Sequence, residues 1–575
     1  MSRKEGIGMD KPLYRSFRAS FSRDIYMPVC GAVAAPVVMG EIRCGEDLRA
    51  LGGEKPVQSA ILHINSDLAV EDENGSPIAS LYEALALCAR SVPVLYLEDE
   101  DTACALAEFA EYHHLADAIL CAKHAKRQVL SYAYEKMPLL RGMLDLRGEK
   151  MDIAKIPACA VAHGATSVIA DADAIDCDAV DSLQRRFIHV IVGEGDDFAQ
   201  SAVKGVNGIL TRDPDAAYAF LSRFPEGSYL RRAKLFAHKG FSNNGMYSEN
   251  TITSVVAAAE NHFDGAEIDV KLTADDVPVV MHNVNTVGLF DCEKMITEET
   301  DYAALAALRR IGFPEESVDR FEDLMRAMAE HTETPVLIEL KPGAKYHNVE
   351  EMVRLVDGIL LRPESQKNCI CIMGEIDPGH AYVHRHLPYL PISYCEGAGA
   401  MPPPPKDRAE AEECLWRIAR LTKGCAAGYN GEDTGMNRLL NEYAKFRMLT
   451  VFPWSRSWTL EPSKWEENGP DNCKTYLSGY DAWTTDHGEK FLPLPVRLTP
   501  LAHRSADGRP LGEAVFRDGH RQTVECDLLV LGNDVQKADD GTCRGKGRAL
   551  FSQKTELYFG ESCRIYSAPV DIDWP

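Results

Sequence analysis

The chain has 575 residues, too many for a single hydrophobic core, so two to four domains are expected. Hydrophobic residues make up 45% and charged residues 26%, as in an ordinary water-soluble globular protein. The net charge of -25 argues against nucleic acid or an anionic membrane as the main partner. For an anionic substrate, a bound divalent cation and local lysines would have to reverse the field at the site.

Cysteine usage and hydropathy indicate the cellular compartment in which the protein is expected. The 17 cysteines include no C-x-x-C pair, and this odd, unpatterned count predicts reduced, mostly buried thiols in a cytoplasm. No apolar run reaches the ~18 residues that a membrane-spanning helix needs. The apolar stretch 28–39 contains two prolines and follows 27 mostly polar residues, so no signal peptide is expected. The sequence leaves homo-oligomer formation open.

Three strand-like runs in the first 230 residues resemble later runs in the same order, which favours a duplicated domain. The pairs are 60–65 with 279–283, 92–98 with 334–339, and 205–213 with 479–486. The first copy keeps His63, but its nearest counterpart of a later Glu-x-Asp pair is Glu41-Ile-Arg43. At roughly 190 residues it is also short for a closed barrel. We expect a degenerate barrel-like domain at 1–230 that holds no metal and packs against the second copy, caps its mouth or forms a dimer.

Four apolar runs in the next segment end on or near residues that can bind a metal or transfer a proton. The runs are 234–240, 266–270, 277–283 and 335–341. Helical patterns such as 249–263 and 321–331 separate them, and a strand–helix–strand rhythm predicts a parallel sheet. If that sheet closes into a barrel, the functional side chains meet at the C-terminal ends of its strands.

Further runs complete the pattern at 369–373, 390–394, 425–430, 447–454 and 480–486. The resulting nine candidates are one more than an eight-stranded barrel needs, and the sequence does not indicate which is spare. The span of about 260 residues suits a (β/α)8 TIM-like barrel. We predict this α/β barrel at 231–496. The short β-like runs and turns that follow predict a small β-sandwich at 497–575, more often a brace than a binding module.

Three carboxylates are candidate metal ligands. Glu267 and Asp269 are two residues apart, so in a strand they point to one face, and Glu339 ends another run. A hard cation such as Mg²⁺ or Ca²⁺ binds carboxylate oxygens and substrate phosphate. The structural alternative is that these acids form salt bridges with neighbouring lysines. Their combination with strand-end histidines favours a divalent cation.

His238 and His282 follow two of these runs and are the candidate general acid and base. Phosphodiester hydrolysis needs one group to assist the attacking oxygen and another to protonate the leaving alcohol. Taken singly, each histidine is more often a partly buried residue with satisfied hydrogen bonds. Their position beside the proposed ligands favours catalysis.

The motifs in this region resemble those of the glycerophosphodiester phosphodiesterases, a branch of the phospholipase C-like barrels. They are His238-Lys-Gly240, Glu249-Asn-Thr251, Gly265-Ala-Glu-Ile-Asp269, Val279-Val-Met-His282 and Ile338-Glu-Leu-Lys341. The resemblance implies that Glu267, Asp269 and Glu339 bind the metal. It also implies that His238 and His282 are the catalytic pair. It also implies Lys341 as a phosphate contact and Trp454 as an aromatic residue near the glycerol of the substrate.

The chain departs from the family pattern at two positions. Lys239 stands where the family usually has arginine, and Asn283 where it has aspartate. Lysine is a point charge without the two-pronged grip of arginine, so Lys239 is expected to bind phosphate more weakly or to suit another head group. Neither departure removes a proposed ligand or catalytic histidine.

These features predict a metal-dependent phosphodiester hydrolase. Its substrates would be glycerophosphodiesters or similar small phosphodiesters, cleaved to a phosphomonoester, sn-glycerol 3-phosphate, and an alcohol. One alternative is a lyase that releases a cyclic phosphate by the same acid–base chemistry. The other is a non-catalytic binding or scaffold protein, which Lys239, Asn283 and the degenerate first copy would favour.

Overall fold

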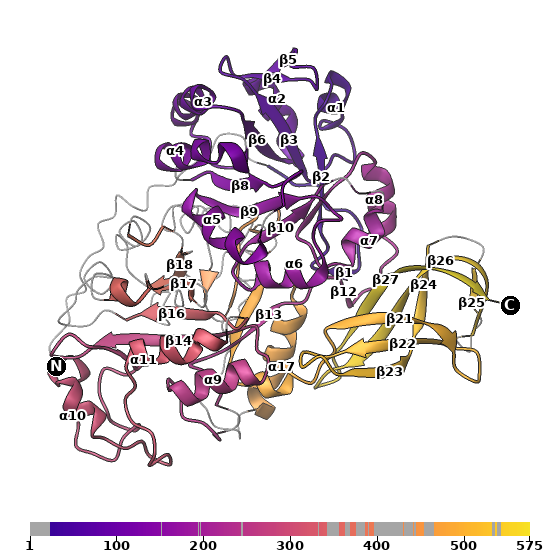
Figure 1. Cartoon of the computed structure of the whole chain (residues 1–575). Helices are drawn as coiled ribbons and strands as arrows, with labels where there is room; N and C mark the ends of the chain where they lie inside the picture. Colours follow the sequence, from indigo (N-terminus) through magenta and orange to yellow (C-terminus); the bar gives the residue numbers. More distant parts are fainter. Residues whose placement is uncertain are drawn as a thin grey trace.

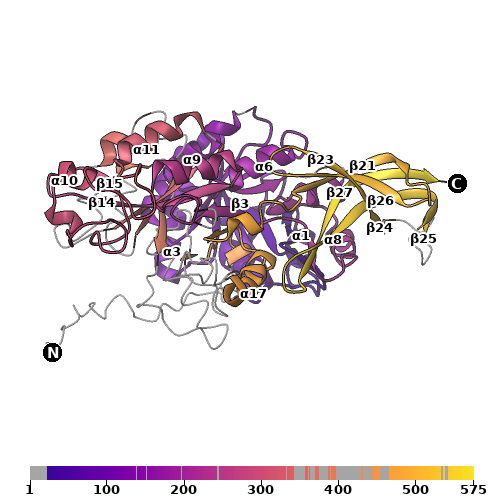
Figure 2. The same ribbon diagram turned by 90° about the horizontal axis from the view of Figure 1, so that it is seen from below.

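A computed structural model shows the protein as two α/β barrels and a β-sandwich (Figure 1). It describes residues 23–574 apart from 342–355, 363–368, 375–385, 396–428, 431–440, 454–464 and shorter gaps. The first barrel lies at the top of Figure 1, the second at the lower left and the sandwich at the lower right. In the view from below, the sandwich projects from one end of the molecule (Figure 2). No helix in the described part of the chain is long and apolar enough to cross a bilayer.

The first barrel is closed by eight parallel strands. β2 pairs with β11 on one side and with β3 on the other, which completes the ring. The expectation that this segment is too short to close is wrong, because strands of three to six residues suffice. The strands are β2 (Val37–Glu41), β3 (Ser59–Ile64), β6 (Val92–Leu97), β7 (Ile119–Lys123), β8 (Arg141–Asp145), β9 (Ala165–Ala170), β10 (His189–Val192) and β11 (Gly208–Leu210). Two antiparallel strands, β4 (Ala69–Glu71) and β5 (Pro77–Ser80), extend from β3.

Helices surround this barrel, and five of the eight that the structure describes begin at a serine or aspartate side chain that caps the helix. The Asp99 side chain, for example, accepts a hydrogen bond from Thr102 N at the start of α3. The helices are α1 (Gly45–Ala50), α2 (Leu81–Leu87), α3 (Glu100–His113), α4 (Gln128–Lys136), α5 (Ile156–Ala162), α6 (Cys177–Gln184), α7 (Phe198–Ala202) and α8 (Pro214–Leu221).

The second barrel repeats this order of elements. Its described parallel strands run in the order β19-β18-β17-β16-β14-β13-β20. They are β13 (Lys234–Ala237), β14 (Gly265–Leu272), β16 (Val336–Leu340), β17 (Cys369–Gly374), β18 (Ile392–Cys395), β19 (Tyr429–Asn430) and β20 (Ala482–Thr485). The helices with described bounds are α9 (Ile252–Glu260), α10 (Tyr302–Ala306), α11 (Phe321–Ala327) and α17 (Trp465–Leu477). The predicted TIM-like architecture is confirmed, whereas a common origin of the two barrels stays a prediction.

The spare candidate strand is the one at 277–283. β15 (Pro278–Val280) pairs antiparallel with β14, so it forms a hairpin rather than another barrel strand. Reading it as part of the parallel series is therefore wrong. Of the other candidates, 447–454 contains no named strand in its described residues. Its backbone nevertheless lies beside β20, because Thr484 N donates to Pro453 O at 3.1 Å.

The C-terminal segment forms two packed sheets, as the predicted sandwich requires. β21 (Arg497–Arg504), β22 (Pro510–Val515) and β23 (Arg521–Glu525) form one sheet. The other contains β24 (Asp527–Val530), β25 (Val535–Lys537), β26 (Cys543–Glu556) and β27 (Ser562–Trp574). This larger sheet also takes in β1 (Ala32–Val33) and β12 (Ser228–Tyr229) from the first 230 residues. The sandwich is thus joined to the barrels, and the domain boundaries stay a prediction.

The two barrels pack through the N-terminal ends of their strands. Phe446 and Met448 come from the segment between β19 and β20 of the second barrel. Their side chains lie in the apolar interior of the first barrel. Arg447 Nη2 contacts Asp117 Oδ2 at 2.7 Å just before β7, and both side chains are 1% exposed. His189 is the first residue of β10, and its Nε2 forms a hydrogen bond with Thr450 Oγ1 at 3.2 Å. Among the three expected roles of the first copy, these contacts show packing against the second barrel.

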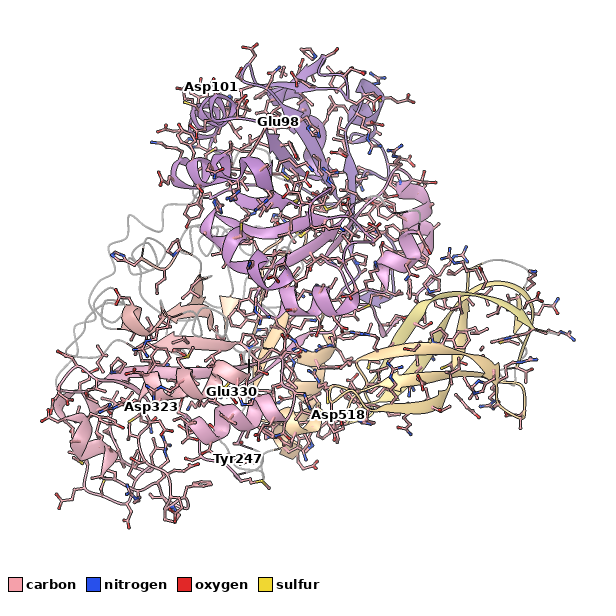
Figure 3. The ribbon with its side chains drawn as sticks, in the orientation of Figure 1. Glu98, Asp101, Tyr247, Asp323, Glu330 and Asp518 are labelled. Atoms are coloured by element: carbon pink, nitrogen blue, oxygen red, sulfur yellow. The ribbon has the colours of Figure 1, made fainter. Side chains whose placement is uncertain are left out.

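The C-terminal mouths of the barrels therefore face away from each other. Glu98 follows β6 of the first barrel, and Tyr247 lies in the loop after β13 of the second. Figure 3 shows these two labelled residues at opposite ends of the molecule. The predicted site residues at the second mouth are therefore far from the mouth of the first barrel.

Candidate active site at the mouth of the second barrel

The alternation of β14 directs two carboxylates into the barrel. Ile268 and Val270 lie in the apolar layer with the helices, so Glu267 and Asp269 point to the opposite face. Glu339 of β16 lies beside Asp269 in the ladder. Oxygens of the three acids lie within 4.8 Å of one another, and none of the three residues is more than 2% exposed.

This donor set fits a hard divalent cation. Glu267 Oε1 is buried and accepts no hydrogen bond, which costs free energy unless a cation binds it. Burial, together with the charge of Asp269, raises the pKa of Glu267 to about 8. Such a shift is typical of carboxylates crowded together without enough counter-charge. Among the described residues, these acids are the group whose donor atoms could hold a metal ion.

Two lysines lie at the same mouth, each beside a carboxylate. Lys341 Nζ is 3.3 Å from Asp269 Oδ1 and also contacts Glu339. Lys239 Nζ is 3.4 Å from Glu249 Oε1. The salt-bridge alternative therefore holds for Lys341, but one ammonium group shared within a cluster of three acids leaves negative charge for a cation.

His238 follows β13, and the turn after it is sterically constrained. Lys239 has φ +53° and Gly240 has φ +80°. A Cβ at Gly240 would lie 2.3 Å from Ser254 Oγ, so this left-handed position requires glycine. The turn aims the Lys239 N–H at Glu267 Oε2, 2.9 Å away. His238 Nε2 lies 3.9 Å from the same oxygen, so the ring faces the carboxylate cluster.

His282 reaches this mouth through the β14–β15 hairpin. β15 runs back along β14, and Met281 N donates to Asp269 O at 2.9 Å. His282 consequently returns to the level of Asp269, with its Nδ1 3.0 Å from Asn283 Oδ1. Burial lowers the pKa of His282, although the charge of Asp269 opposes the shift.

Asp486, which the sequence analysis did not assign to the site, orients His238. It follows β20, and its Oδ1 lies 2.8 Å from His238 Nδ1. Burial disfavours the imidazolium, but Asp486 and Glu267 outweigh it and raise the pKa of His238 to about 9. His238 Nδ1 thus donates to Asp486 while Nε2 faces the cluster. The signal was present in the sequence, because Asp486 ends an apolar run as the other site residues do.

The loop before α9 positions one proposed ligand. Asn250 Nδ2 donates to Asp269 Oδ2 at 2.8 Å, and Asn250 Oδ1 accepts from Asp269 N at 3.0 Å. Arg310, 3% exposed, donates to the carbonyls of Glu249 and Asn250 and so braces this loop. The motif Glu249-Asn-Thr251 therefore holds the Asp269 carboxylate in place through hydrogen bonds, as the outer partners of metal ligands do.

All predicted site residues that the structure describes converge on this mouth: Glu267, Asp269, Glu339, His238, His282, Lys239 and Lys341. The remaining prediction, Trp454, lies outside the described residues.

The first barrel has different residues at the corresponding strand positions. Its second strand, β3, has Ile61 and His63 where β14 has its two acids, and Tyr96 lies beside His63 in the ladder as Glu339 lies beside Asp269. Glu41 ends the first strand, β2, so its assignment as the counterpart of the Glu-x-Asp pair is wrong. Matching 60–65 with 279–283 is also wrong, because β3 is a parallel barrel strand and β15 is not.

Basic side chains balance two acids at the first mouth, Glu41 and Asp145. Lys123 Nζ lies 3.3 Å from Asp145 Oδ2. Arg147 lies 3.2 Å from Glu41 Oε2 through Nη1 and 3.0 Å from Asp145 Oδ2 through Nη2. His63 Nε2 lies 3.1 Å from Glu41 Oε1. The acids here have a protein cation as their partner, in contrast to the unpartnered oxygen of the second mouth.

Comparisons with known proteins point to one family of enzymes for part of the chain. Residues 238–367 match the model of the "Glycerophosphoryl diester phosphodiesterase family". A glycerophosphodiester phosphodiesterase of Bacillus altitudinis is 28% identical over 126 residues, which cover 21% of this chain and 51% of the relative. Glycerophosphodiester phosphodiesterase 1 of Rattus norvegicus is 43% identical over 56 residues, or 10% and 16% of the two chains. The chain thus spans about half the length of the Bacillus relative and less of the rat one.

Solved structures also match at low similarity. A phosphodiesterase of Oleispira antarctica in complex with the product sn-glycerol-3-phosphate has a TM-score of 0.37 and 18% identity, covering 45% of this chain and 95% of its own. A glycerophosphodiester phosphodiesterase of Parabacteroides distasonis has a TM-score of 0.33 and 20% identity, covering 45% and 94%.

Proposed function

We propose that the second mouth is the active site of a phosphodiesterase that hydrolyses glycerophosphodiesters or similar small phosphodiesters. One observation carries the proposal: three buried carboxylates, one with an unpartnered oxygen, share this mouth with two histidines. The family match over 238–367 supports it, because it spans both histidines and all three acids. The products would be a phosphomonoester, sn-glycerol 3-phosphate, and an alcohol.

Glu267, Asp269 and Glu339 would hold the divalent cation, Mg²⁺ or Ca²⁺. When bound, such a cation polarises phosphate oxygens and stabilises the negative charge that develops on them. Local positive charge is needed in any case, because the chain carries a net charge of -25 and its substrate is an anion.

His238 and His282 would perform the acid–base chemistry. One assists the attacking water, and the other gives a proton to the leaving alcohol. Asp486 acts as a positioning residue, because it accepts a hydrogen bond from His238 Nδ1 and leaves Nε2 directed at the site. His282 follows β15 of the hairpin and His238 follows β13. The two imidazole rings would therefore reach the phosphate from different strands.

Lys239, Lys341 and Trp454 would contact the substrate. Lys341 touches two of the proposed ligands, so neutralisation of those carboxylates would leave its ammonium group available to a phosphate oxygen. Lys239 follows a catalytic histidine and needs only to exchange Glu249 for phosphate. The role of Trp454 depends on the family resemblance alone.

The rest of the chain would support this barrel. We place catalysis in residues 231–496, with 1–230 and 497–575 as supporting domains. The twelve cysteines whose side chains the structure describes are free thiols, which suits the reducing cytoplasm.

The test is product analysis with the purified full chain. We would incubate it with glycerophosphodiesters and Mg²⁺ or Ca²⁺ in ¹⁸O-labelled water and follow the products by ³¹P NMR. The proposal expects a phosphomonoester that contains ¹⁸O, since water supplies the new oxygen. A cyclic phosphate without ¹⁸O would identify a lyase instead, and no turnover of any diester would favour a binding protein.

A further inference from the structure

A second polar cavity lies where both barrels and the sandwich meet. Its volume is about 340 Å³, and its walls come from α6, from the segment leading into β13 and from the sandwich turn at 515–519. Asp518, labelled in Figure 3, marks that turn beside the second barrel. Lys234 lines the cavity at the first residue of β13, whereas His238 follows the last, so the cavity is at the opposite end of the barrel from the proposed active site.

The charge of this junction cavity is the reverse of that of the whole protein. Eight lysine or arginine side chains line it, against two aspartates. Three more carboxylates, Asp264, Asp481 and Glu513, lie behind the lining and pair with it. Basic groups still exceed acidic ones by three, in a chain with a net charge of -25. Such a local excess favours an anionic ligand.

Asp181 of α6 is shared by three of the basic groups. Its Oδ1 lies 2.5 Å from Lys234 Nζ, and its Oδ2 lies 2.5 Å from Arg232 Nη2 and 3.0 Å from Arg185 Nη2. Asp181 alone therefore balances only one of these three positive charges.

Asp264, just before β14, is the second shared acid. Its Oδ2 lies 2.6 Å from Arg232 Nη1 and 2.6 Å from Arg517 Nη1, and its Oδ1 lies 3.1 Å from Arg185 Nε. The four basic groups of both clusters thus have two carboxylates between them, which leaves two positive charges in excess.

The excess charge is buried. The side chains of Lys234 and Arg517 are 2% and 6% exposed, and Arg517 Nε is buried without a hydrogen-bond acceptor. Burial lowers the pKa of Lys234 to about 8, despite its contact with Asp181. Buried charges in excess of their partners cost free energy, which a bound anion would recover.

We propose that the junction cavity binds a small molecule with a phosphate group, either inorganic phosphate or an organic phosphomonoester. A phosphate dianion matches the two positive charges in excess and offers acceptors to Arg517 and its neighbours. The volume is at the lower end of the range for small-molecule sites, which excludes large polyanions. Because three parts of the chain form the walls, the ligand would also fix them together. This site is separate from the proposed active site and does not depend on its function.

The test is calorimetric titration of the full chain, in EDTA, with inorganic phosphate and separately with glycerol 3-phosphate at constant ionic strength. Arg517→Gln and Lys234→Gln each remove one positive charge from the cavity. Both variants should fold, because three basic groups remain to pair with Asp181 and Asp264. The matched control is Arg509→Gln, which removes an exposed sandwich arginine that pairs with Glu525. Thermal unfolding without ligand checks that the variants are folded.

We expect saturable binding of at least one of the two compounds by the wild-type chain and by Arg509→Gln. Arg517→Gln and Lys234→Gln should each weaken it by at least about tenfold, the loss expected for one charge-assisted hydrogen bond. The compound that binds more tightly separates inorganic from organic phosphate as the source. Absence of saturable binding would overturn the proposal. So would binding that both cavity variants retain, because that binding would belong to another site.

Discussion

Asp486→Asn tests how the proposed active site holds His238. The substitution keeps the size of the side chain but replaces a buried carboxylate, 2.8 Å from His238 Nδ1, with a neutral amide. A hydrogen bond to a charged group is worth about 1.5–3 kcal/mol, which corresponds to a loss of about 10- to 150-fold in kcat. A second effect concerns charge: Asp486 raises the pKa of His238, now about 9, so its removal should lower that pKa.

The assay is hydrolysis of a glycerophosphodiester across a range of pH, with metal content and thermal stability measured on the same samples. We expect a fall in kcat with little change in KM, and a shift to lower pH of the limb that reports His238. Asp518→Asn is the matched control, because Asp518 also pairs with a histidine, His520, but at the exposed surface of the sandwich. If Asp486→Asn kept kcat within about twofold of wild type and left the pH profile unmoved, the positioning role would be refuted, since general acid–base groups contribute far more than this.

Substitutions elsewhere separate the remaining roles. His238→Ala and His282→Ala should each lower kcat at least ~100-fold with metal content retained, and near-normal turnover in either would return that histidine to a structural role. His63→Ala should leave turnover within about twofold, because the residue lies at the other mouth beside Glu41, and a large loss in a stable, metal-loaded variant would mean a shared site. Lys239→Ala should raise KM and lower kcat/KM in steady-state assays, whereas Lys239→Arg should keep activity, because arginine retains the charge and adds a second donor. Loss of activity in the arginine variant alone would refute the phosphate contact.

Much of the second barrel could be predicted, because its proposed site residues end apolar runs. The main error there was β15, whose apolar run looks like the others. Only residues 273–277 separate it from β14, and a parallel crossover needs about a dozen residues or more. The spacing could therefore have identified the hairpin that returns His282 to the mouth.

Other features depend on contacts that the sequence does not encode locally. Closure of the first barrel rests on pairing between β2 and β11, which are far apart in the chain. The junction cavity depends on Arg517 and Asp264, which meet only when the sandwich packs against the second barrel. Asp486 ends an apolar run, so the sequence could have indicated it as a site residue. Its partner His238 lies 248 residues away, so only the fold identifies its role.

Metal reconstitution is the most direct test of the proposed active site. Wild-type protein freed of metal with EDTA should lose hydrolysis of glycerophosphodiesters, and added Mg²⁺ or Ca²⁺ should restore it, because Glu267 Oε1 then gains the partner that the protein does not supply. The double variant Glu267→Gln, Asp269→Asn should remain inactive after the same additions. Full activity in the chelator, or in the double variant, would contradict the assignment of this mouth as a metal-dependent phosphodiesterase site.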